Sequence, residues 1–589
     1  MSKNGEEIVL RGLPISKGIG IGFPVYFASL DDQFPEITIP IGDVDTEIDR
    51  YREALEKSRR DVETLQKLSM GNGPSEVVSI LGTHLEMMQD PLLTSVMESR
   101  IRDMKRNTES IFQNIIEEYK ARFKTIKDHY FQERVRDIVD VSRRILGHLS
   151  PLEQLKMTEV PHNSIILTQE LVPSETVEAN ASLVSAFVTA AGGITSHAAI
   201  IARAKGIPYV ANVDIKDLKK VEVYSIIVDG SGGLVILNPT RATLKRYQEM
   251  QKCYQKNYKM LKSSSHLKGE TIDGYEVRIF ANLENPKEVD QLVKAGVCGI
   301  GLFRSEYLFL MKKEFPKEQE QFLTYKKMVR ALKGRPLIVR IFDIGGDKKV
   351  DMPLTSPHTE YFNEIGPELN PALGCRAIRF LLRYPELLDA QIRAILRVSQ
   401  FGEIHILIPM VSDITEIRQV RERVEKIRRE LEKKNIKTAK NIPIGCMIEV
   451  PSAAIMCDAL AEEVDFLSIG TNDLVQYILA ADRSNNYTAD LYYSTHPSII
   501  RLIRMVVASA NSTRKPVIIC GEHAADPSLI PLLIGLGIRE FSVAARHIPI
   551  VKHTIRKWRI LEACRLAEGA LEYTSAKELS EYLAQETNR

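Results

Sequence analysis

The chain has 589 residues, of which 44% are hydrophobic and 26% charged, a composition that is typical of globular domains and excludes a disordered or low-complexity protein. Its 79 Lys and Arg residues balance 77 Asp and Glu residues at a formal net charge of +2, so we expect no bulk binding to nucleic acid. No apolar run approaches the roughly 18–20 residues of a membrane span, and the first residues lack the pattern of a signal peptide, so we expect no membrane association.

The seven cysteines are scattered, and no two of them have the CxxC spacing of zinc or redox motifs. Such a set in a large chain is typical of reduced thiols in the cytosol, so we expect a cytoplasmic protein. One cysteine could be catalytic, and the others are expected to be small core residues. They are Cys253, Cys298, Cys375, Cys446, Cys457, Cys520 and Cys564.

The first 240 residues contain three segments with different residue patterns. Residues 12–27 predict a glycine-rich turn and a β-like stretch, in which Gly20-Ile21-Gly22 lacks the third glycine and the helix of a nucleotide loop and favours a bulged strand. From about 44 to 148, apolar residues recur at helical spacing among charges of both signs, which predicts a solvated helical bundle. From about 163 to 239, short β-branched runs alternate with helical or turn pieces, as in a compact α/β unit. The simplest topology lets residues 1–30 rejoin 150–240, with the bundle inserted between them.

The rest of the chain predicts a linker and a barrel. Residues 241–262 form one charged helix and 263–269 a loop, which together suit a helical linker between domains. After residue 270, strand-like runs alternate regularly with amphipathic helices, and eight such repeats predict a (β/α)₈ barrel. The runs are 276–281, 299–303, 337–342, 404–410, 442–450, 466–469, 517–520 and 540–543.

Basic and acidic side chains follow these predicted strands, at the face where barrel enzymes bind their substrates. Several arginines there could bind a substrate with many negative oxygens, because guanidinium groups match phosphate and carboxylate bidentately. Glu449 and Asp473 suit a hard, oxygen-liganded ion such as Mg²⁺. A single residue of this kind would be more simply an exposed ion pair, whereas their joint occurrence favours a binding site. The basic residues are Arg304, Arg340, Lys348, Arg376 and Arg483, and Asn472, Cys520 and Glu522 accompany them.

A second candidate site lies in the α/β unit, in the run Gly192-Gly193-Ile194-Thr195-Ser196-His197. Two glycines make a turn and small residues then begin a helix, so His197 is expected near a helix N-terminus, where backbone N–H groups favour an anion. An imidazole there could carry a phosphoryl group, and Thr195 could hydrogen-bond one ring nitrogen and leave the other free to react. A structural histidine remains an equally good explanation of this run by itself.

Together these motifs resemble those of a known family. The chain is similar, from about residue 10 to 565, to Enzyme I of the bacterial sugar phosphotransferase system, the phosphoenolpyruvate–protein phosphotransferases. The resemblance rests on Leu171-Val-Pro-Ser-Glu-Thr176, Gly192-Gly-Ile-Thr-Ser-His197, Asn238-Pro-Thr240, Leu302-Phe-Arg-Ser-Glu306, Asp343-Ile-Gly-Gly-Asp-Lys348, Ile469-Gly-Thr-Asn-Asp-Leu474 and Cys520-Gly-Glu522.

The resemblance implies a role for each candidate residue. His197 would accept the phosphoryl group of phosphoenolpyruvate and pass it to a histidine of the small phosphocarrier HPr, with release of pyruvate and with Thr195 orienting the ring. Cys520 would protonate the enolate. The substrate would be bound by Arg304, Arg340 and Arg483, with Lys348 and Arg376 nearby and Asn472 on the phosphate or carboxylate. Glu449 and Asp473 would hold Mg²⁺, and His84 and Arg134 would contact the partner near the active histidine.

The resemblance also implies the architecture. Residues 1–32 and 149–240 would form a swivelling phosphohistidine α/β domain, and 33–148 an inserted helical HPr-binding domain. Residues 241–269 would be the linker, and 270–589 the phosphoenolpyruvate-binding (β/α)₈ barrel that carries the homodimer interface.

Three features depart from the family pattern. Ile194 stands where an arginine is usual, which removes a positive charge three residues from His197. The segment 349–369 is longer than usual, which could reshape the rim of the barrel mouth. His523 and His547 replace commoner apolar or small residues, and the sequence gives no functional account of either.

Two other functions deserve comparison. Pyruvate phosphate dikinase and phosphoenolpyruvate synthase share the swivelling domain and the barrel, but they need a large ATP-binding domain, and the chain shows neither such a segment nor a glycine-rich nucleotide loop. A regulatory phosphorelay protein that binds HPr-like partners without serving sugar uptake would have the same chemistry. The sequence does not separate that function from transport, because the sugar-specific components are other chains.

Overall fold

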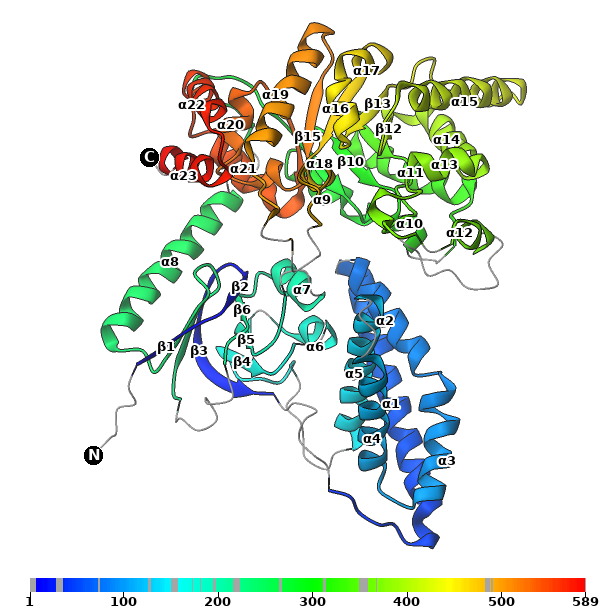
Figure 1. Ribbon diagram of the computed structural model, residues 1–589, viewed down its shortest axis with the longest axis vertical. Helices are drawn as coiled ribbons and strands as arrows, with labels where there is room; N and C mark the ends of the chain where they lie inside the picture. Colours follow the sequence, from blue (N-terminus) through cyan, green and yellow to red (C-terminus); the bar gives the residue numbers. More distant parts are fainter. Residues whose placement is uncertain are drawn as a thin grey trace. The chain divides into compact units, whose positions relative to one another are not determined.

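The computed structural model describes residues 7–587 except 28–34, 73–74, 125–128, 150–156, 172, 181, 194–196, 215–222, 264–266, 311–313, 349–358, 367, 483–487 and 489–490. The chain divides into two compact units, Met1–Asn257 and Tyr258–Arg589 (Figure 1). None of the seven cysteines forms a disulfide. Among the described helices, none combines the length and the apolar character that crossing a membrane would require.

The first unit contains an eight-stranded sheet to which both ends of the unit contribute. Its order is β1-β8-β7-β3-β4-β5-β6-β2, with β3, β4, β5 and β6 parallel to one another. The three strands before the helical region therefore share one sheet with the five that follow it, as expected. The strands are β1 Ile8–Arg11, β2 Leu13–Ser16, β3 Ile19–Tyr26, β4 Ser164–Thr168, β5 Val184–Thr189, β6 Tyr209–Ala211, β7 Ile226–Asp229 and β8 Leu234–Leu237.

The glycine pair of the N-terminal motif lies within β3, in regular register with both neighbouring strands, so the expected bulge is absent from this strand. A Cβ atom at Gly22 would lie 1.7 Å from the carbonyl oxygen of Asn163, and one at Gly20 would lie 2.4 Å from that of Ser185. These glycines are required because neighbouring backbone approaches β3 closely, and they form no nucleotide loop.

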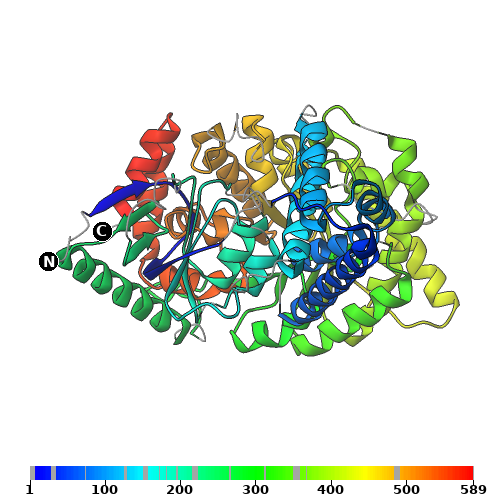
Figure 2. The same cartoon turned by 90° about the horizontal axis from the view of Figure 1, so that it is seen from below.

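The inserted helices form a bundle around one apolar core. In α1 the buried residues recur every three or four positions, which gives the helix one apolar face. Ile201 of α7 joins this core, and α6 and α7 lie between the bundle and the sheet (Figures 1 and 2). The helices of the unit are α1 Val44–Asn72, α2 Ser75–Met87, α3 Ser95–Met104, α4 Thr108–Lys124, α5 His129–Leu149, α6 Pro173–Glu178 and α7 His197–Lys205, followed by α8 Arg241–Ser263.

The second unit is a closed barrel of eight parallel strands, which confirms the predicted fold class. The strands are nearly continuous apolar runs, since they are covered on both faces. They are β9 Arg278–Leu283, β10 Ile300–Arg304, β11 Leu337–Arg340, β12 Ile404–Ile408, β13 Ile444–Ile448, β14 Phe466–Gly470, β15 Val517–Cys520 and β16 Glu540–Ala544.

Helices connect and surround these strands (Figure 1). They are α9 Val289–Lys294, α10 Tyr307–Leu310, α11 Glu318–Leu332, α12 Thr359–Ile365, α13 Ile378–Arg383, α14 Pro385–Val398, α15 Ile414–Lys433, α16 Pro451–Ile455, α17 Cys457–Glu463, α18 Thr471–Leu479, α19 Pro497–Ser512, α20 Ile530–Gly535, α21 Ile548–Ile555, α22 Ile560–Glu572 and α23 Ala576–Thr587.

Candidate active site

The candidate site lies where the parallel strands of the barrel end. Arg304 and Arg340 are the last residues of β10 and β11, and Cys520 is the last residue of β15. Glu449 follows β13, and Asp473 lies in the first turn of α18, directly after β14. Because the carboxyl ends of parallel strands meet at one face, the topology alone brings these side chains to the same mouth.

Asp343, three residues beyond the end of β11, is the centre of the charge network. It is fully buried, it forms an ion pair with Arg340 Nη1 at 3.1 Å, and it accepts a hydrogen bond from the Lys348 ammonium group. Arg376 binds both of its carboxylate oxygens. Burial alone would raise the pKa of Asp343, but the charges of Lys348, Arg340 and Arg376 hold it well below its usual value. This lowered pKa favours the charged carboxylate, which binds three basic side chains at the mouth.

All five N–H groups of Arg376 donate hydrogen bonds to other residues of the protein. Beside the two bonds to Asp343, Nη1 donates to Asp347 Oδ1 at 3.1 Å and to the Tyr477 hydroxyl at 3.3 Å, and Nη2 donates to Asp473 Oδ2 at 3.0 Å. The residue was expected to lie near the substrate. In this arrangement it orders the surrounding carboxylates, and it must exchange a partner before it can bind a ligand directly.

Arg340 retains bonding capacity. Its Nη2 lies 3.3 Å from Glu306 Oε1, and its buried Nε has no hydrogen-bond partner among the described residues. A buried N–H group without a partner is costly, so a ligand oxygen that reached this donor would remove that cost.

The turn after β11 depends on two glycines. Gly345 and Gly346 have φ values of 93° and 58°, and Cβ atoms there would lie 2.3 Å from the carbonyl oxygen of Cys375 and 2.4 Å from that of Pro371. A side chain at either glycine would prevent the close approach of the backbone of residues 371 and 375 to this turn. That approach brings Lys348 and Arg376 to the carboxylate of Asp343.

A buried polar network beneath Arg340 has no signal in the sequence. Ser305 Oγ donates to the Arg340 carbonyl oxygen at 2.6 Å, and Gln391 of α14 accepts from the Phe342 N–H at 3.1 Å. Gln391 also donates to Ser305 Oγ and to the Tyr325 hydroxyl. The network satisfies the backbone groups at the point where β11 leaves the sheet, and so it orients Arg340 and Asp343.

Glu449 and Asp473 have the chemistry of a divalent-metal site. Glu449 is buried, its Oε1 accepts the Met410 N–H at 2.7 Å, and its Oε2 lies beside Gly470. Burial and the negative charges of Asp473 and Asp343 raise the pKa of Glu449 to about 7, so a cation at these oxygens would relieve the repulsion. No cluster of three or more His, Cys, Asp or Glu side chains suited to a metal occurs in the described chain. Two carboxylates alone fit Mg²⁺, which commonly takes its other ligands from substrate and water.

Cys520 lies inside the barrel at the mouth. Its thiol donates to the Ile469 carbonyl oxygen at 3.3 Å and lies 3.7 Å from Ser468 Oγ. Burial raises the pKa of the Cys520 thiol to about 11, so the group keeps its proton near neutral pH. A protonated thiol at this position can act as a proton donor and is a poor nucleophile.

The remaining expected substrate contacts are less buried. Arg304 Nη1 donates to Glu284 Oε1 at 2.5 Å in a half-exposed pair. Asn472 uses its Oδ1 to accept the Glu522 N–H at 2.9 Å, which leaves its amide nitrogen as the donor for a ligand. Arg483 lies outside the described residues.

The second candidate site is described in part. His197 is the first residue of α7, as the sequence indicated, while Thr195 and Ile194 lie outside the described residues. His84 is buried in α2, a helix that contacts α7. Arg134 lies in α5.

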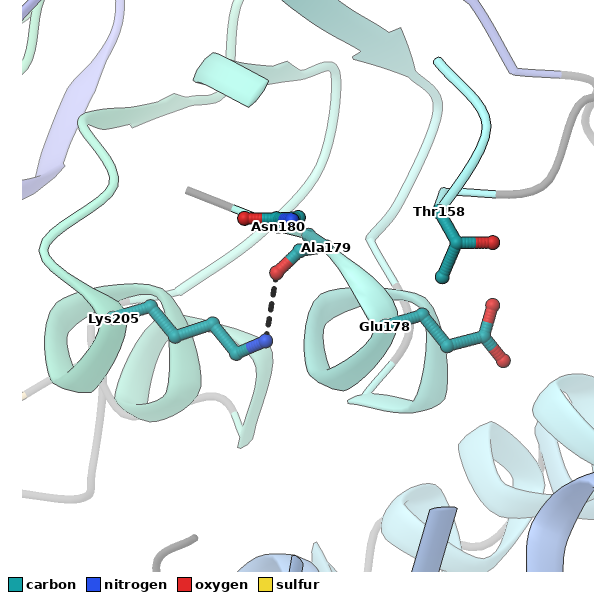
Figure 3. A pocket seen from close by; sticks show the side chains of 5 residues that line it. All are labelled: Thr158, Glu178, Ala179, Asn180 and Lys205. Carbon is teal, nitrogen blue, oxygen red and sulfur yellow. Dashed lines mark hydrogen bonds between the residues drawn. The ribbon is translucent and has the colours of Figure 1, made fainter. Parts of the chain in front are cut away.

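A hollow of about 410 Å³ opens elsewhere in the first unit, and it contains none of the expected residues. Its Lys205 donates to the carbonyl oxygen of Ala179, the residue after α6, at 2.7 Å (Figure 3). Lys205 also donates to the carbonyl oxygen of Val177 in the last turn of α6. Both bonds satisfy carbonyl groups at a helix C-terminus, so Lys205 has a structural role here.

The barrel mouth combines basic side chains with an acidic pair, and comparison with known proteins shows that the chain is a phosphoenolpyruvate-utilising enzyme. Profiles of PEP-utilising enzymes match residues 11–134 (N-terminal domain), 160–233 (mobile domain) and 259–560 (PEP-binding domain). The chain is 34% identical over 581 residues to the phosphoenolpyruvate-protein phosphotransferase of Listeria innocua, covering 98% of this chain and 99% of that one. It is 34% identical over 580 residues to that of Staphylococcus carnosus, with the same coverage.

A solution structure of Enzyme I (nEIt) also aligns with the chain, at 28% identity over 42% of this chain and 99% of that one, with a TM-score of 0.35. From the nearly full-length relatives and the three profiles, the chain belongs to the phosphoenolpyruvate-protein phosphotransferase family, the Enzyme I type of PEP-utilising enzyme.

Proposed function

We propose that the protein transfers the phosphoryl group of phosphoenolpyruvate first to His197 and then to a histidine of the phosphocarrier HPr, releasing pyruvate. The observation that carries this proposal is the arrangement at the mouth of the barrel, where three basic side chains share the buried carboxylate of Asp343 and where the Cys520 thiol ends β15. Such a site suits a small substrate with both phosphate and carboxylate groups and a carbon that must be protonated.

In the first half-reaction, the P–O bond to the enol oxygen breaks and a P–N bond to His197 forms. Phosphoryl transfer depends mainly on positioning and on holding the negative oxygens, and we assign this to Arg340, Arg304 and Arg483, with Lys348, Arg376 and Asn472 nearby. The enolate left behind takes the Cys520 proton at carbon to become pyruvate, and the thiolate regains a proton from water.

We propose that Glu449 and Asp473 hold Mg²⁺, because their carboxylates suit a hard cation and repel each other without one. Bound there, the ion would supply positive charge beside the substrate oxygens. Arg376, which binds Asp473 Oδ2 at 3.0 Å, keeps that carboxylate oriented.

The second half-reaction is proposed to use the first unit. His197 at the start of α7, oriented by Thr195, would pass its phosphoryl group to HPr bound on the helical insertion 33–148, with His84 and Arg134 near the contact. We assign the phosphohistidine domain to 1–32 and 149–240, the linker to 241–269 and the barrel domain to 270–589. A cytoplasmic setting would keep the Cys520 thiol reduced.

We also propose that the barrel forms a homodimer. Ile455, Met456 and Met505 are each more than one third exposed on adjacent elements, because α16 and α17 both contact α19. Exposed apolar side chains gathered in this way favour a protein contact. The double variant Ile455→Glu/Met505→Glu should lower the mass measured by light scattering to that of one chain. Leu323→Glu on α11, which also places a charge at an exposed apolar position, is the control and should leave the mass unchanged.

The function is tested with phosphoenolpyruvate labelled in its phosphate, with and without HPr. We expect label on this chain alone and, when HPr is added, on HPr, with one pyruvate released for each phosphoryl group transferred. Transfer to water without labelling of either protein would refute the proposal. Transfer to a nucleotide would indicate chemistry of the dikinase type.

A further inference from the structure

His523 lies three residues after Cys520, in the turn of 3₁₀ helix His523–Ala525, and it is 2% exposed. Its Nε2 lies 2.6 Å from the carbonyl oxygen of Ser494, while its buried Nδ1 has no partner in the part of the chain that the structure describes. A carbonyl oxygen only accepts, so Nε2 carries the proton. Burial lowers the pKa of His523, which agrees with a neutral ring committed to a single tautomer.

The bond to Ser494 closes a ring of interactions around Asn472. The Glu522 N–H donates to Asn472 Oδ1 at 2.9 Å, and the Tyr492 hydroxyl donates to the Asn472 carbonyl oxygen at 3.0 Å. Glu522 and His523 are consecutive, and Tyr492 and Ser494 are two residues apart. The ring therefore joins the first turn of α18, the turn after β15 and the segment before α19.

The loop after Cys520 packs closely against Asn472 and its neighbour Thr471. Thr471 Oγ1 donates to the Cys520 carbonyl oxygen at 3.0 Å, and Gly521 has a φ of 92°. A Cβ atom at Gly521 would lie 2.4 Å from Thr471 Oγ1 and 2.7 Å from Asn472 Oδ1. Because the fit is this close, a shift of the ring would move both the Asn472 amide and the backbone that carries the Cys520 thiol.

We propose that His523 is a positioning residue for the phosphoenolpyruvate half-reaction. By binding Ser494 it fixes the ring of Tyr492, Asn472 and Glu522, and thereby aims the Asn472 amide nitrogen at the substrate and holds the Cys520 loop. This rests on the proposed function, in which Asn472 contacts the substrate and Cys520 protonates it.

The segment that His523 binds has a second anchor away from the ring. Thr495 Oγ1 lies 2.6 Å from Ser580 Oγ of α23, and Pro497 begins α19 two residues later. Loss of the His523 bond should therefore leave the fold intact, and Thr495→Val is a matched control that removes a hydrogen bond of the same segment without touching the ring.

The experiment compares His523→Leu, His523→Gln and Tyr492→Phe with Thr495→Val in the full-length protein. We expect His523→Leu and Tyr492→Phe to raise KM for phosphoenolpyruvate about tenfold and to weaken its binding in calorimetry by a similar factor, the size of one lost hydrogen bond. Phosphoryl exchange between His197 and HPr should be unchanged. His523→Gln, whose amide can still donate to Ser494, should recover most of the loss, and Thr495→Val should behave as the unaltered protein.

Coupling to Asn472 separates positioning from general stability. The double variant His523→Leu/Asn472→Ala should bind phosphoenolpyruvate no more weakly than Asn472→Ala alone, because His523 acts through that residue. Additive losses, equal slowing of both half-reactions, or unaltered KM and binding in His523→Leu would overturn the inference. If the unaltered protein bound phosphoenolpyruvate without phosphorylating His197, the proposed function would fail, whereas the binding comparison would still decide the role of His523.

Discussion

Arg376 and Asp343 form a buried ion pair through two parallel hydrogen bonds, from Nε to Oδ1 at 2.9 Å and from Nη2 to Oδ2 at 3.1 Å. The pair joins residues 33 positions apart, and both side chains are fully excluded from solvent. Because Arg340 and Lys348 share the same carboxylate, one anion sets the position of three cations at the mouth of the barrel.

This arrangement predicts a large effect of Asp343→Asn on stability. The substitution removes the one fully buried carboxylate charge that Arg340 and Arg376 share, and breaking a buried pair in this way costs about 3–5 kcal/mol. The free energy of unfolding of the barrel, measured by urea titration, should fall accordingly. Glu284→Gln makes the same chemical change in the half-exposed pair with Arg304, where about 0–1 kcal/mol is expected. Equal losses in the two variants would contradict the special role of Asp343.

Arg340→Lys should be harmful although the charge is kept. An ammonium group cannot reproduce the guanidinium fork that binds Asp343 and Glu306 and still presents Nε to a ligand. We expect kcat for pyruvate release to fall roughly 100-fold, as for loss of one group that holds developing charge, while exchange between His197 and HPr is spared. Near-normal turnover would show that Arg340 only balances the neighbouring carboxylates.

Glu449→Gln and Asp473→Asn should each raise the Mg²⁺ concentration needed for half-maximal activity. Each removes one negative charge from a hard cation's ligands, and ligand charge sets the affinity. A titration of pyruvate formation with MgCl₂ measures the effect, and Glu522→Gln is a control for loss of a carboxylate near the mouth. Unchanged metal dependence in both variants would remove these residues from the metal site.

Cys520→Ala should slow pyruvate formation and the phosphorylation of His197 by phosphoenolpyruvate, but not exchange between His197 and HPr, in which no carbon is protonated. With its pKa raised to about 11, the Cys520 thiol keeps its proton at pH 9, where an ordinary thiol with a pKa of 9.0 would be half ionised. The rate of pyruvate formation should therefore not fall between pH 7 and 9 through loss of this proton. Equal slowing of both half-reactions would point instead to damage of the fold.

Much of the fold could be predicted from local patterns. All eight barrel strands were predicted to within two residues at each end, because each is a continuous apolar run bounded by turns. The strand β8 was not predicted, since Leu234–Leu237 is short and directly follows another strand. The prediction of a bulge at Gly20 and Gly22 was wrong. These glycines are required because the backbone of residues 163 and 185, which are distant in sequence, approaches them closely.

The candidate site, too, could be predicted from local patterns only in part. Strand ends indicated Arg340, Glu449 and Cys520, because topology alone brings them together. Gln391 could not be found in this way: it occupies an ordinary helical position in α14, and its role depends on Ser305, 86 residues away. The ring closed by His523 likewise joins residues 29 and 50 positions apart. Partnerships of this kind depend on tertiary packing, which no local spacing encodes.

The most direct test of the central claim is to locate the phosphoryl group. The full-length protein is incubated with phosphoenolpyruvate and Mg²⁺, digested under alkaline conditions that preserve phosphohistidine, and analysed by tandem mass spectrometry beside His197→Ala. We predict one phosphoryl group, on His197, and none on the His197→Ala protein, which should still bind phosphoenolpyruvate at the barrel. A phosphoryl group on another residue, or on the His197→Ala protein, would contradict the proposed route from the barrel through His197 to HPr.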